Sequence, residues 1–437
     1  MNPSSGYSLN PAEQVKLKTY LVNSVSRELE SRPPSPRQRR EIIESYLQQA
    51  YEATKLSLSD PVRKSIFKEI LDEMLGFGPI QPLLDDPTVS EVMVNGPKNV
   101  YVERNGKITL SDIQFEDDDA VLRIIDKIIL PLGRRVDSDN PTVDARLPDG
   151  SRVNAIIPPV AIDGPTITIR KFMKDKLSME QLVALGSITK SMSDLLKACV
   201  VSRLNILVSG GTGSGKTTFL NILSSFIPSN ERIVTIEDAA ELKLQQPHVV
   251  RLETKPANSE GLHAVPIREL VRNSLRMRPD RIIVGEVRGG EALDMLQAMN
   301  TGHDGSLTTL HANTPRDATS RLETMCLMSG MDLPVKVIRE QVAAAIDLVV
   351  QQARLKDGTR KVTSITEISG MEGDTITMTE IFKFQQTGVQ QDGSIIGELR
   401  ATGIRPTFSQ RLEASGFRLG PEIFGANLND MFGHRRS

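Results

Sequence analysis

The sequence lacks several features that mark other classes of protein. It has no tryptophan, only 4% aromatic residues and two cysteines in 437 residues, and its formal net charge is −2. Few aromatic side chains leave few platforms for stacking unpaired bases, and a nearly neutral chain has no overall basic field for nucleic acid. Because Cys199 and Cys326 show no CxxC spacing, we expect reduced thiols that fill the core of a cytoplasmic protein.

Long apolar runs are also missing. The richest stretch, VLRIIDKIIL, is interrupted by Arg123, Asp126 and Lys127, and it falls short of the roughly 20 apolar residues that a membrane-spanning helix needs. The first ten residues, MNPSSGYSLN, have neither the basic nor the apolar region of a signal peptide. We therefore expect any role at a membrane to be peripheral.

What the sequence does contain is a phosphate-binding loop. Residues 204–219, LNILVSGGTGSGKTTF, join an apolar run to a helical pattern through the motif G-x-x-x-x-G-K-[ST]. Glycines let successive backbone N–H groups turn toward a phosphate, and the following helix adds the positive end of its dipole. Lys216 would reach the β and γ phosphates, and the Thr217 hydroxyl would bind Mg²⁺. The residues expected to contact ATP are Gly210, Gly211, Thr212, Gly213, Ser214, Gly215, Lys216, Thr217 and Thr218.

Four apolar strands, separated by helical patterns, are predicted around this loop. They are the run that begins at residue 204 and the segments 232–236, 281–284 and 306–310. Such alternation predicts a parallel, doubly wound sheet of the α/β class, in which ligands bind beyond the carboxyl ends of the strands. The residues that follow the four strands are Gly210, Glu237, Glu286 and His311. We therefore expect these four residues to converge on one triphosphate.

Carboxylates at these strand ends predict hydrolysis of ATP. Glu286 is the candidate for polarising the attacking water, although a solvated carboxylate in a turn would show the same pattern. Many such ATPases have an aspartate before this glutamate to hold Mg²⁺, whereas this chain has Gly285. Glu237 and Asp238 are candidates for the missing negative charge, acting through metal-bound waters. For Asp238, capping of a following helix is an equally good interpretation.

Two histidines and three arginines are further candidates for contacts with the γ-phosphate. His303 and His311 flank the strand at 306–310. A lone histidine is usually structural, but two beside a γ-phosphate would suit a sensor that distinguishes ATP from ADP. The arginine needed at the γ-phosphate has three candidates, Arg146, Arg152 and Arg170, each on or beside a predicted strand. Taken singly, each is more often a surface residue in a salt bridge.

The remaining pattern divides the chain into four parts. Helical spacing dominates the beginning, hairpins with one amphipathic helix at 117–130 follow, and short strands at 348–352, 361–368 and 376–384 predict an antiparallel edge after the parallel sheet. The predicted domains are a helical N-terminal bundle at 1–78, an α+β domain at 79–175, a P-loop ATPase domain at 176–400 and a C-terminal tail at 401–437.

Three more segments resemble those of a known family. RPDRIIVGEVRGGEA (278–292), IVTIEDAAEL (233–242) and GHDGSLTTLHAN (302–313) are similar to the Walker B, Asp and His boxes of the type II/type IV secretion ATPases. The resemblance extends back through RLPDGSRVNAIIPP and forward to GIRPTF, and so covers most of residues 60–410. The segment LRMRPDRIIVGEVRG is most similar to the CpaF/TadA branch, the tight-adherence (Flp) pilus assembly ATPases.

The resemblance implies a RecA-like P-loop domain with a smaller PAS-like α+β domain and a helical extension before it. It also implies a homohexameric ATPase that uses ATP and Mg²⁺ and powers pilus assembly, with retraction left open, as nucleotide closes its two domains. Such a protein is cytoplasmic, is held peripherally at the inner face of the cytoplasmic membrane by pilus platform proteins, acts on pilin indirectly and needs no nucleic acid.

The resemblance also assigns roles to residues. Lys216 and Thr217 bind nucleotide and Mg²⁺, Glu286 serves catalysis and the metal, and Glu237 belongs to the metal's water shell. His303 and His311 sense the nucleotide, Gly285 is normal for the family, and arginines at positions 146, 152 and 170 reach the nucleotide. Three alternatives stay open: a nucleic-acid translocase, a conjugation-type secretion ATPase and a nucleotide-gated regulator that hardly hydrolyses ATP.

Overall fold

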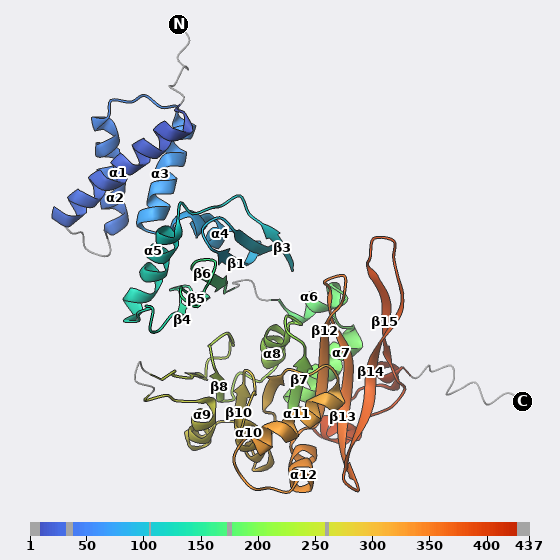
Figure 1. Cartoon of the computed structure of the whole chain (residues 1–437). Helices are drawn as coiled ribbons and strands as arrows, with labels where there is room; N and C mark the ends of the chain where they lie inside the picture. The colour runs from blue at the N-terminus through green and yellow to red at the C-terminus, as the bar shows by residue number, and fades with distance from the viewer. Residues whose placement is uncertain (1–8, 32–37, 105, 173–176, 258–261, 426–437) are drawn as a thin grey trace, which may run out of the picture. The chain divides into compact units, whose positions relative to one another are not determined.

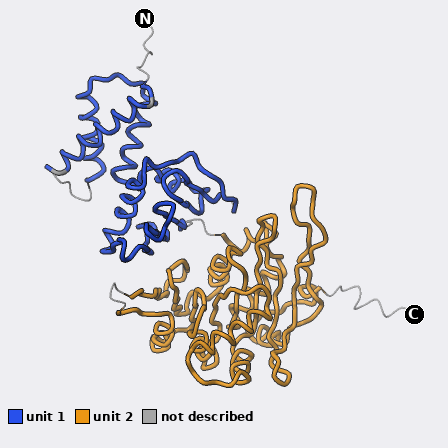
Figure 2. The backbone as a smooth tube through the Cα atoms, viewed as in Figure 1, with its two compact units in different colours: residues 1–175 blue, residues 176–437 orange. Residues whose placement is uncertain are grey.

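The computed structural model describes residues 9–31, 38–104, 106–172, 177–257 and 262–425. The chain divides into two compact units, residues 1–175 and 176–437 (Figures 1 and 2). The division between residues 175 and 176 lies in a segment outside the described residues, and the domain bounds expected from the sequence stay a prediction. Among the helices of the described ranges, none combines the length and apolar character needed to cross a bilayer.

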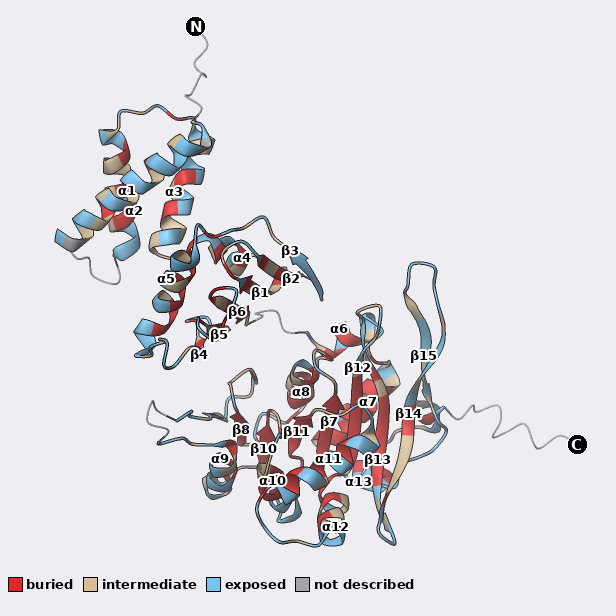
Figure 3. Ribbon diagram, in the orientation of Figure 1, coloured by how far each residue is buried: buried red, intermediate tan, exposed pale blue. Residues whose placement is uncertain are grey.

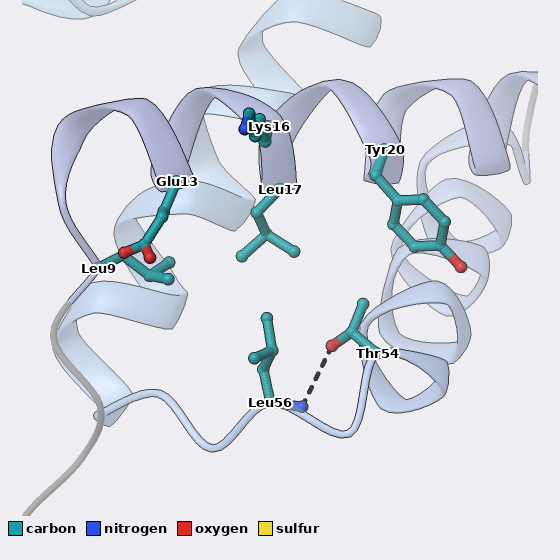
Figure 4. Close-up of a pocket in the computed structure, with 7 residues that line it drawn as sticks. All are labelled: Leu9, Glu13, Lys16, Leu17, Tyr20, Thr54 and Leu56. Carbon is teal, nitrogen blue, oxygen red and sulfur yellow. Dashed lines mark hydrogen bonds between the residues drawn. The ribbon is translucent and has the colours of Figure 1, made fainter.

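Unit 1 begins with three helices, α1 (Pro11–Ser31), α2 (Arg39–Ala53) and α3 (Asp60–Met74). Apolar side chains at helical spacing meet between them, and Leu21, Ile43 and Ile70 are fully buried. An apolar hollow lies beside α1 (Figure 4), lined by Leu9, Glu13, Lys16, Leu17, Tyr20, Thr54 and Leu56. It holds one carboxylate and one ammonium and no phosphate loop, so it is not the site that the sequence predicts.

The second part of unit 1 is a six-stranded antiparallel sheet with the strand order β3-β2-β1-β6-β5-β4. Helix α5 (Asp118–Ile129) covers one face; its N-cap Asp117 accepts from the backbone N–H of Ala120, and its apolar side chains are buried. Short helical turns, η1 (Gly78–Ile80), α4 (Gln81–Asp85) and η2 (Leu130–Leu132), complete this part. The strands are β1 (Val89–Asn95), β2 (Val100–Arg104), β3 (Lys107–Leu110), β4 (Thr142–Arg146), β5 (Arg152–Ile156) and β6 (Thr166–Arg170).

Unit 2 is built on a nine-stranded sheet with the order β15-β14-β13-β12-β7-β11-β10-β8-β9. Neighbours from β12 to β9 in this order are parallel, whereas β12, β13, β14 and β15 pair antiparallel. The strands are β7 (Ile206–Gly210), β8 (Ile233–Glu237), β9 (Val249–Glu253), β10 (Arg281–Val284), β11 (Leu307–Leu310), β12 (Leu348–Arg354), β13 (Arg360–Glu372), β14 (Thr375–Val389) and β15 (Ile395–Ala401).

Helices cover both faces of this sheet. Helices α6 (Met179–Ala184), α7 (Lys190–Val201) and α8 (Lys216–Ser224) share one core with it, and α9 (Ile267–Ser274), α10 (Glu291–Asn300), α11 (Pro315–Leu327) and α12 (Val335–Ala345) share the other. The 3-10 turn η3 (Leu275–Met277) extends α9. Strands β7, β8, β10 and β11 are buried along their whole length (Figure 3), as parallel strands between two helical layers must be. The predicted doubly wound, RecA-like α/β sheet is therefore confirmed.

The end of the chain, expected as a separate tail, packs onto unit 2 where the structure describes it. Phe408, Leu412 of α13 (Ser409–Ala414) and Phe424 of η4 (Pro421–Phe424) enter the core formed by α7 and α8. The buried carboxylate of Glu367 on β13 accepts hydrogen bonds from the backbone N–H and the hydroxyl of Thr407. Residues 426–437 lie outside the described part of the chain.

Candidate functional site

The phosphate loop joins β7 to α8 in the centre of the nine-stranded sheet (Figure 1). A methyl group on Gly210 would lie 2.5 Å from the carbonyl oxygen of Gln352 on β12, so only glycine fits there. Gly213 and Gly215 have φ angles of 70° and 95°, which glycine adopts without strain. These three positions let the chain curl tightly before α8 begins at Lys216.

Lys216 lies inside this curl and is only 7% exposed. Its Nζ donates to the carbonyl oxygen of Gly211 at 3.0 Å and lies 3.4 Å from both ring nitrogens of His311. His311 follows β11, which lies beside β7. Leu310 of β11 pairs with Ser209 of β7. Parallel pairing of neighbouring strands thus brings together a lysine and a histidine that are 95 positions apart.

His311 connects Lys216 to a group of charged side chains. Its Nε2 lies 2.7 Å from Oε1 of Glu286, which follows β10. Nη2 of Arg288 donates to Oε2 of the same glutamate at 2.6 Å, and Nη1 of Arg288 lies 3.8 Å from the carboxylate of Asp238. We call these five residues, Lys216, Asp238, Glu286, Arg288 and His311, the loop-edge cluster.

Electrostatics set the protonation state of this cluster. Burial, and then the charge of Lys216, lower the pKa of His311 below its ordinary 6.5, although Glu286 acts in the opposite direction. Among the described residues Oε1 of Glu286 has no hydrogen-bond partner, so the ring and the carboxylate are close without a contact that fixes the tautomer of His311. The hydrogen bond to Glu286 raises the pKa of Arg288, which therefore stays charged.

Glu237, at the end of β8, is a third carboxylate near the same strand ends and is 3% exposed. Its Oε2 accepts from the backbone N–H groups of Glu241 and Leu242 at 2.8 and 2.9 Å. Its Oε1 is buried and has no hydrogen-bond partner among the residues that the structure describes. Burial raises the pKa of this carboxyl group.

Gly285 has a structural reason to lack a side chain. A methyl group there would lie 2.9 Å from Cγ of Glu237, closer than real Cβ atoms approach. The backbone N–H of Gly285 donates to Ile236 and its carbonyl accepts from Thr309, so the residue cannot swing aside freely. The glutamate of β8 occupies the space that an aspartate at 285 would need.

These residues fit Mg²⁺ held mainly by phosphate and water. Within the described ranges no three His, Cys, Asp or Glu side chains form a group that could hold a metal. Mg²⁺ usually takes one or two protein oxygens, several waters and the phosphates of its nucleotide. The buried, unpaired Oε1 of Glu237 and the hydroxyl of Thr217, at the start of α8, are oxygens of the required kind.

Comparison with known proteins places this architecture in a family. Residues 73–394 match the family described as Type II/IV secretion system protein. The chain belongs to that family. It is 39% identical over 307 residues to a putative conjugal transfer protein of Mycobacterium tuberculosis, covering 69% of this chain and 87% of the relative. It is 34% identical over 328 residues to the type IV secretion system protein VirB11 of Bartonella quintana, and this match covers 66% of this chain and 90% of the relative.

Among solved structures, the chain is similar to the VirB11 ATPase of Brucella suis in complex with sulphate. That similarity has 31% identity and a TM-score of 0.36, and it covers 66% of this chain and 91% of the other. As a member of the type II/IV secretion system family, the chain is an ATPase.

One predicted residue of this secretion ATPase does not reach the loop-edge cluster. His303 precedes β11, whereas His311 follows it, so the four-residue strand separates them. The backbone N–H of His303 donates to the carbonyl oxygen of Ala298, and its Nδ1 lies 3.3 Å from that same oxygen at the end of α10. The structure therefore does not place His303 beside Lys216, because it is held at the opposite end of the strand.

The three candidate arginines lie side by side in unit 1. Arg146 on β4 pairs with Arg152 on β5, and Arg152 pairs with Arg170 on β6. Cross-strand partners share a face, and the adjacent residues Val153 and Ile169 point into the core under α5, so the arginines occupy the other face. Like charges placed directly opposite disfavour each other. The row continues to Glu91 on β1, which pairs with Arg170, so a carboxylate stands at one end of it.

Sequence reasoning missed three arginines close to the loop, Arg288, Arg354 and Arg360. Arg288 stands two residues after Glu286 in the Walker B box, and this proximity was a signal that could have been used. Arg360 gave no local signal: its Nε donates to the carbonyl oxygen of Gly213 at 2.9 Å, although 147 positions separate the two residues. Only the pairing of β12 with β7 brings it there.

Proposed function

We propose that this chain is the ATP-hydrolysing motor of a tight-adherence (Flp) pilus or a related secretion machine. The observation that supports it most is the loop-edge cluster: Glu286, the water-activating candidate, is joined through His311 to Lys216 of the phosphate loop. The sequence similarity to the CpaF/TadA branch supports the pilus as the machine that it drives.

In this proposal the chain's own residues position ATP and water. Lys216 leaves the carbonyl of Gly211 and turns to the β and γ phosphates, while backbone N–H groups of the loop hold the β phosphate. Thr217 and Glu237 would hold Mg²⁺ near Glu286, and the ion would supply positive charge to the triphosphate.

Glu286 then orients a water for attack. The water oxygen bonds to the γ phosphorus, the bond from phosphorus to the β–γ bridging oxygen breaks, and the water's proton passes to the carboxylate. Its contacts to His311 and Arg288 fix the direction of that carboxylate. Because His311 touches both Lys216 and Glu286, a change at the γ phosphate alters the contacts of both, which suits it to sense hydrolysis.

In a motor, ATP hydrolysis must be coupled to a movement of the protein. We propose that nucleotide binding closes the two units, that Arg146, Arg152 and Arg170 supply positive charge to the phosphates, and that hydrolysis reverses the closure. The expected assembly is a homohexameric ring, cytoplasmic and held peripherally at the inner membrane by pilus platform proteins, with pilin moved indirectly.

One substitution and two measurements on the wild-type chain test this function. Lys216→Ala should abolish ATP turnover, pilus assembly and secretion in cells that carry the variant, and the purified wild-type chain should behave as a hexamer in light scattering and co-purify with a platform protein. Pili that assemble normally with Lys216→Ala, at wild-type protein levels, would contradict the proposal.

A conjugation-type secretion ATPase is the second candidate, favoured by the naming of the M. tuberculosis relative as a putative conjugal transfer protein. Turnover that rises on addition of DNA, and loses this response as salt increases, would favour that function. Turnover that DNA leaves unchanged supports the pilus motor, for which we expect no nucleic acid.

A further inference from the structure

The hairpin of β12 and β13 passes beside the phosphate loop. β12 pairs in parallel with β7, with Gln352 opposite Gly210, so β12 continues past the point where β7 becomes the loop (Figure 1). The last residue of β12, Arg354, lies opposite Arg360, the first residue of β13. The topology therefore places two arginines next to the loop.

Arg360 contacts the loop directly. Its Nε donates to the carbonyl oxygen of Gly213 at 2.9 Å, and a methyl group on Gly215 would lie 3.4 Å from its Cδ. The next N–H, that of Ser214, donates to the carbonyl of Gly211 at 3.4 Å. Both ends of the peptide group between residues 213 and 214 are thus held, one of them by a side chain from outside the loop.

The turn that carries Arg360 is itself fixed. Leu355 and Thr359 are hydrogen-bonded across it, and Asp357 accepts from the backbone N–H and the hydroxyl of Thr359. The other oxygen of Asp357 accepts from the backbone N–H of Ile395 at 2.8 Å, which ties the turn to β15. The hydrogen bonds from Thr359 lower the pKa of Asp357 to about 2, so these contacts persist at any physiological pH.

We propose that Arg360 is a positioning residue for nucleotide binding, which holds the phosphate loop in the shape that accepts a β phosphate. The proposal rests on the loop being the nucleotide site. ATP and ADP both carry a β phosphate, so Arg360 should strengthen the binding of both nucleotides to the same extent. It should contribute little to the hydrolytic step, because it contacts the loop rather than the γ phosphate.

The test is nucleotide affinity in the Glu286→Gln background, in which bound ATP should not be turned over. Arg360→Ala should weaken ATP and ADP binding alike by about tenfold, the worth of one hydrogen bond from a charged group. Lys356→Ala is the matched control, because it removes an equal charge from an exposed position on the same turn. It should bind both nucleotides as the parent does.

Two further readouts separate positioning from other roles. In the wild-type background Arg360→Ala should raise KM for ATP about tenfold and change kcat less than twofold, and thermal stability without nucleotide should be unchanged because Arg360 is exposed. Unchanged affinities in Arg360→Ala would overturn the proposal. So would a fall in kcat with unchanged affinities, or an equal weakening by Lys356→Ala. A chain without substitutions that binds no nucleotide would instead refute the function on which the proposal rests.

Discussion

A methyl group at position 285 tests whether Glu237 must keep its place beside the phosphate loop. In Gly285→Ala the new Cβ would lie 2.9 Å from Cγ and 3.5 Å from Cβ of Glu237. Carbon atoms in contact are about 3.5–4.0 Å apart, so the glutamate side chain must move by at least about 0.6 Å. Gly285 is not among the glycines with positive φ, so the alanine backbone itself is unstrained.

Glu237 cannot move without losing contacts. Its Oε2 is held by the backbone N–H groups of Glu241 and Leu242, and a hydrogen bond to a charged group is worth about 1.5–3 kcal/mol. If that energy holds the Mg²⁺-binding geometry, Gly285→Ala should lower kcat/KM for Mg·ATP by about 10- to 100-fold. It should also raise the Mg²⁺ concentration that gives half-maximal turnover.

Steady-state ATP hydrolysis, titrated with Mg²⁺ at saturating ATP, measures both effects. Glu237→Gln should reproduce the Mg²⁺ shift without a methyl group at 285. Gly388→Ala is the control for the substitution type, because its methyl group would meet only Cδ1 of Ile396, at an ordinary 3.8 Å. A Gly285→Ala variant with the Mg²⁺ dependence of the wild type would refute the assignment of Glu237 to the metal.

Two further outcomes follow from the structure. Since burial and a neighbouring ammonium lower the pKa of His311 below 6.5, the ring gains a proton only as pH falls through that lower value. kcat/KM for ATP should therefore decline on an acid limb centred below pH 6.5, and His311→Gln should lack that limb; an unchanged acid limb in the variant would contradict the role of the ring. Gly305→Ala should destabilise unit 2, because its methyl group would lie 1.9 Å from Nη1 of Arg281, a fully buried side chain paired with Glu231. Breaking a buried pair costs about 3–5 kcal/mol, a fall in Tm on the order of 10 °C, whereas Gly302→Ala, with a similar φ but open space around it, should show only the smaller backbone effect. Equal Tm values for the two variants would refute the clash.

The parts of the fold that the sequence predicted are those with local patterns. Unbroken apolar runs marked β7, β8, β10 and β11, which helices bury on both faces. Strands β9 and β15 escaped prediction because both are edge strands with partly exposed, charged residues, and β15 also contains Gly397. A strand that is open on one side needs no apolar run, and so it leaves a weaker signal.

The site was predictable to the extent that strand ends define it. Lys216, Glu286 and His311 follow neighbouring strands, and parallel pairing brings them into contact. The roles that we assign to them remain predictions. Arg360 could not have been found in the same way, because its contact with the loop depends on how β12 pairs with a strand about 150 positions earlier. His303 was selected as a candidate because it lies in the same motif as His311, but it precedes β11, at the end of the strand away from Lys216.

The most direct test of the account is turnover and nucleotide binding by Glu286→Gln, measured on the same preparation. The substitution keeps the size of the side chain and an oxygen that can accept from Arg288, but it removes the carboxylate that would take the proton from water. ATP should bind with wild-type affinity, while kcat should fall at least about 100-fold, the usual worth of a positioned general base. A variant that binds ATP normally and hydrolyses it at the wild-type rate would contradict the assignment of Glu286 to the attacking water.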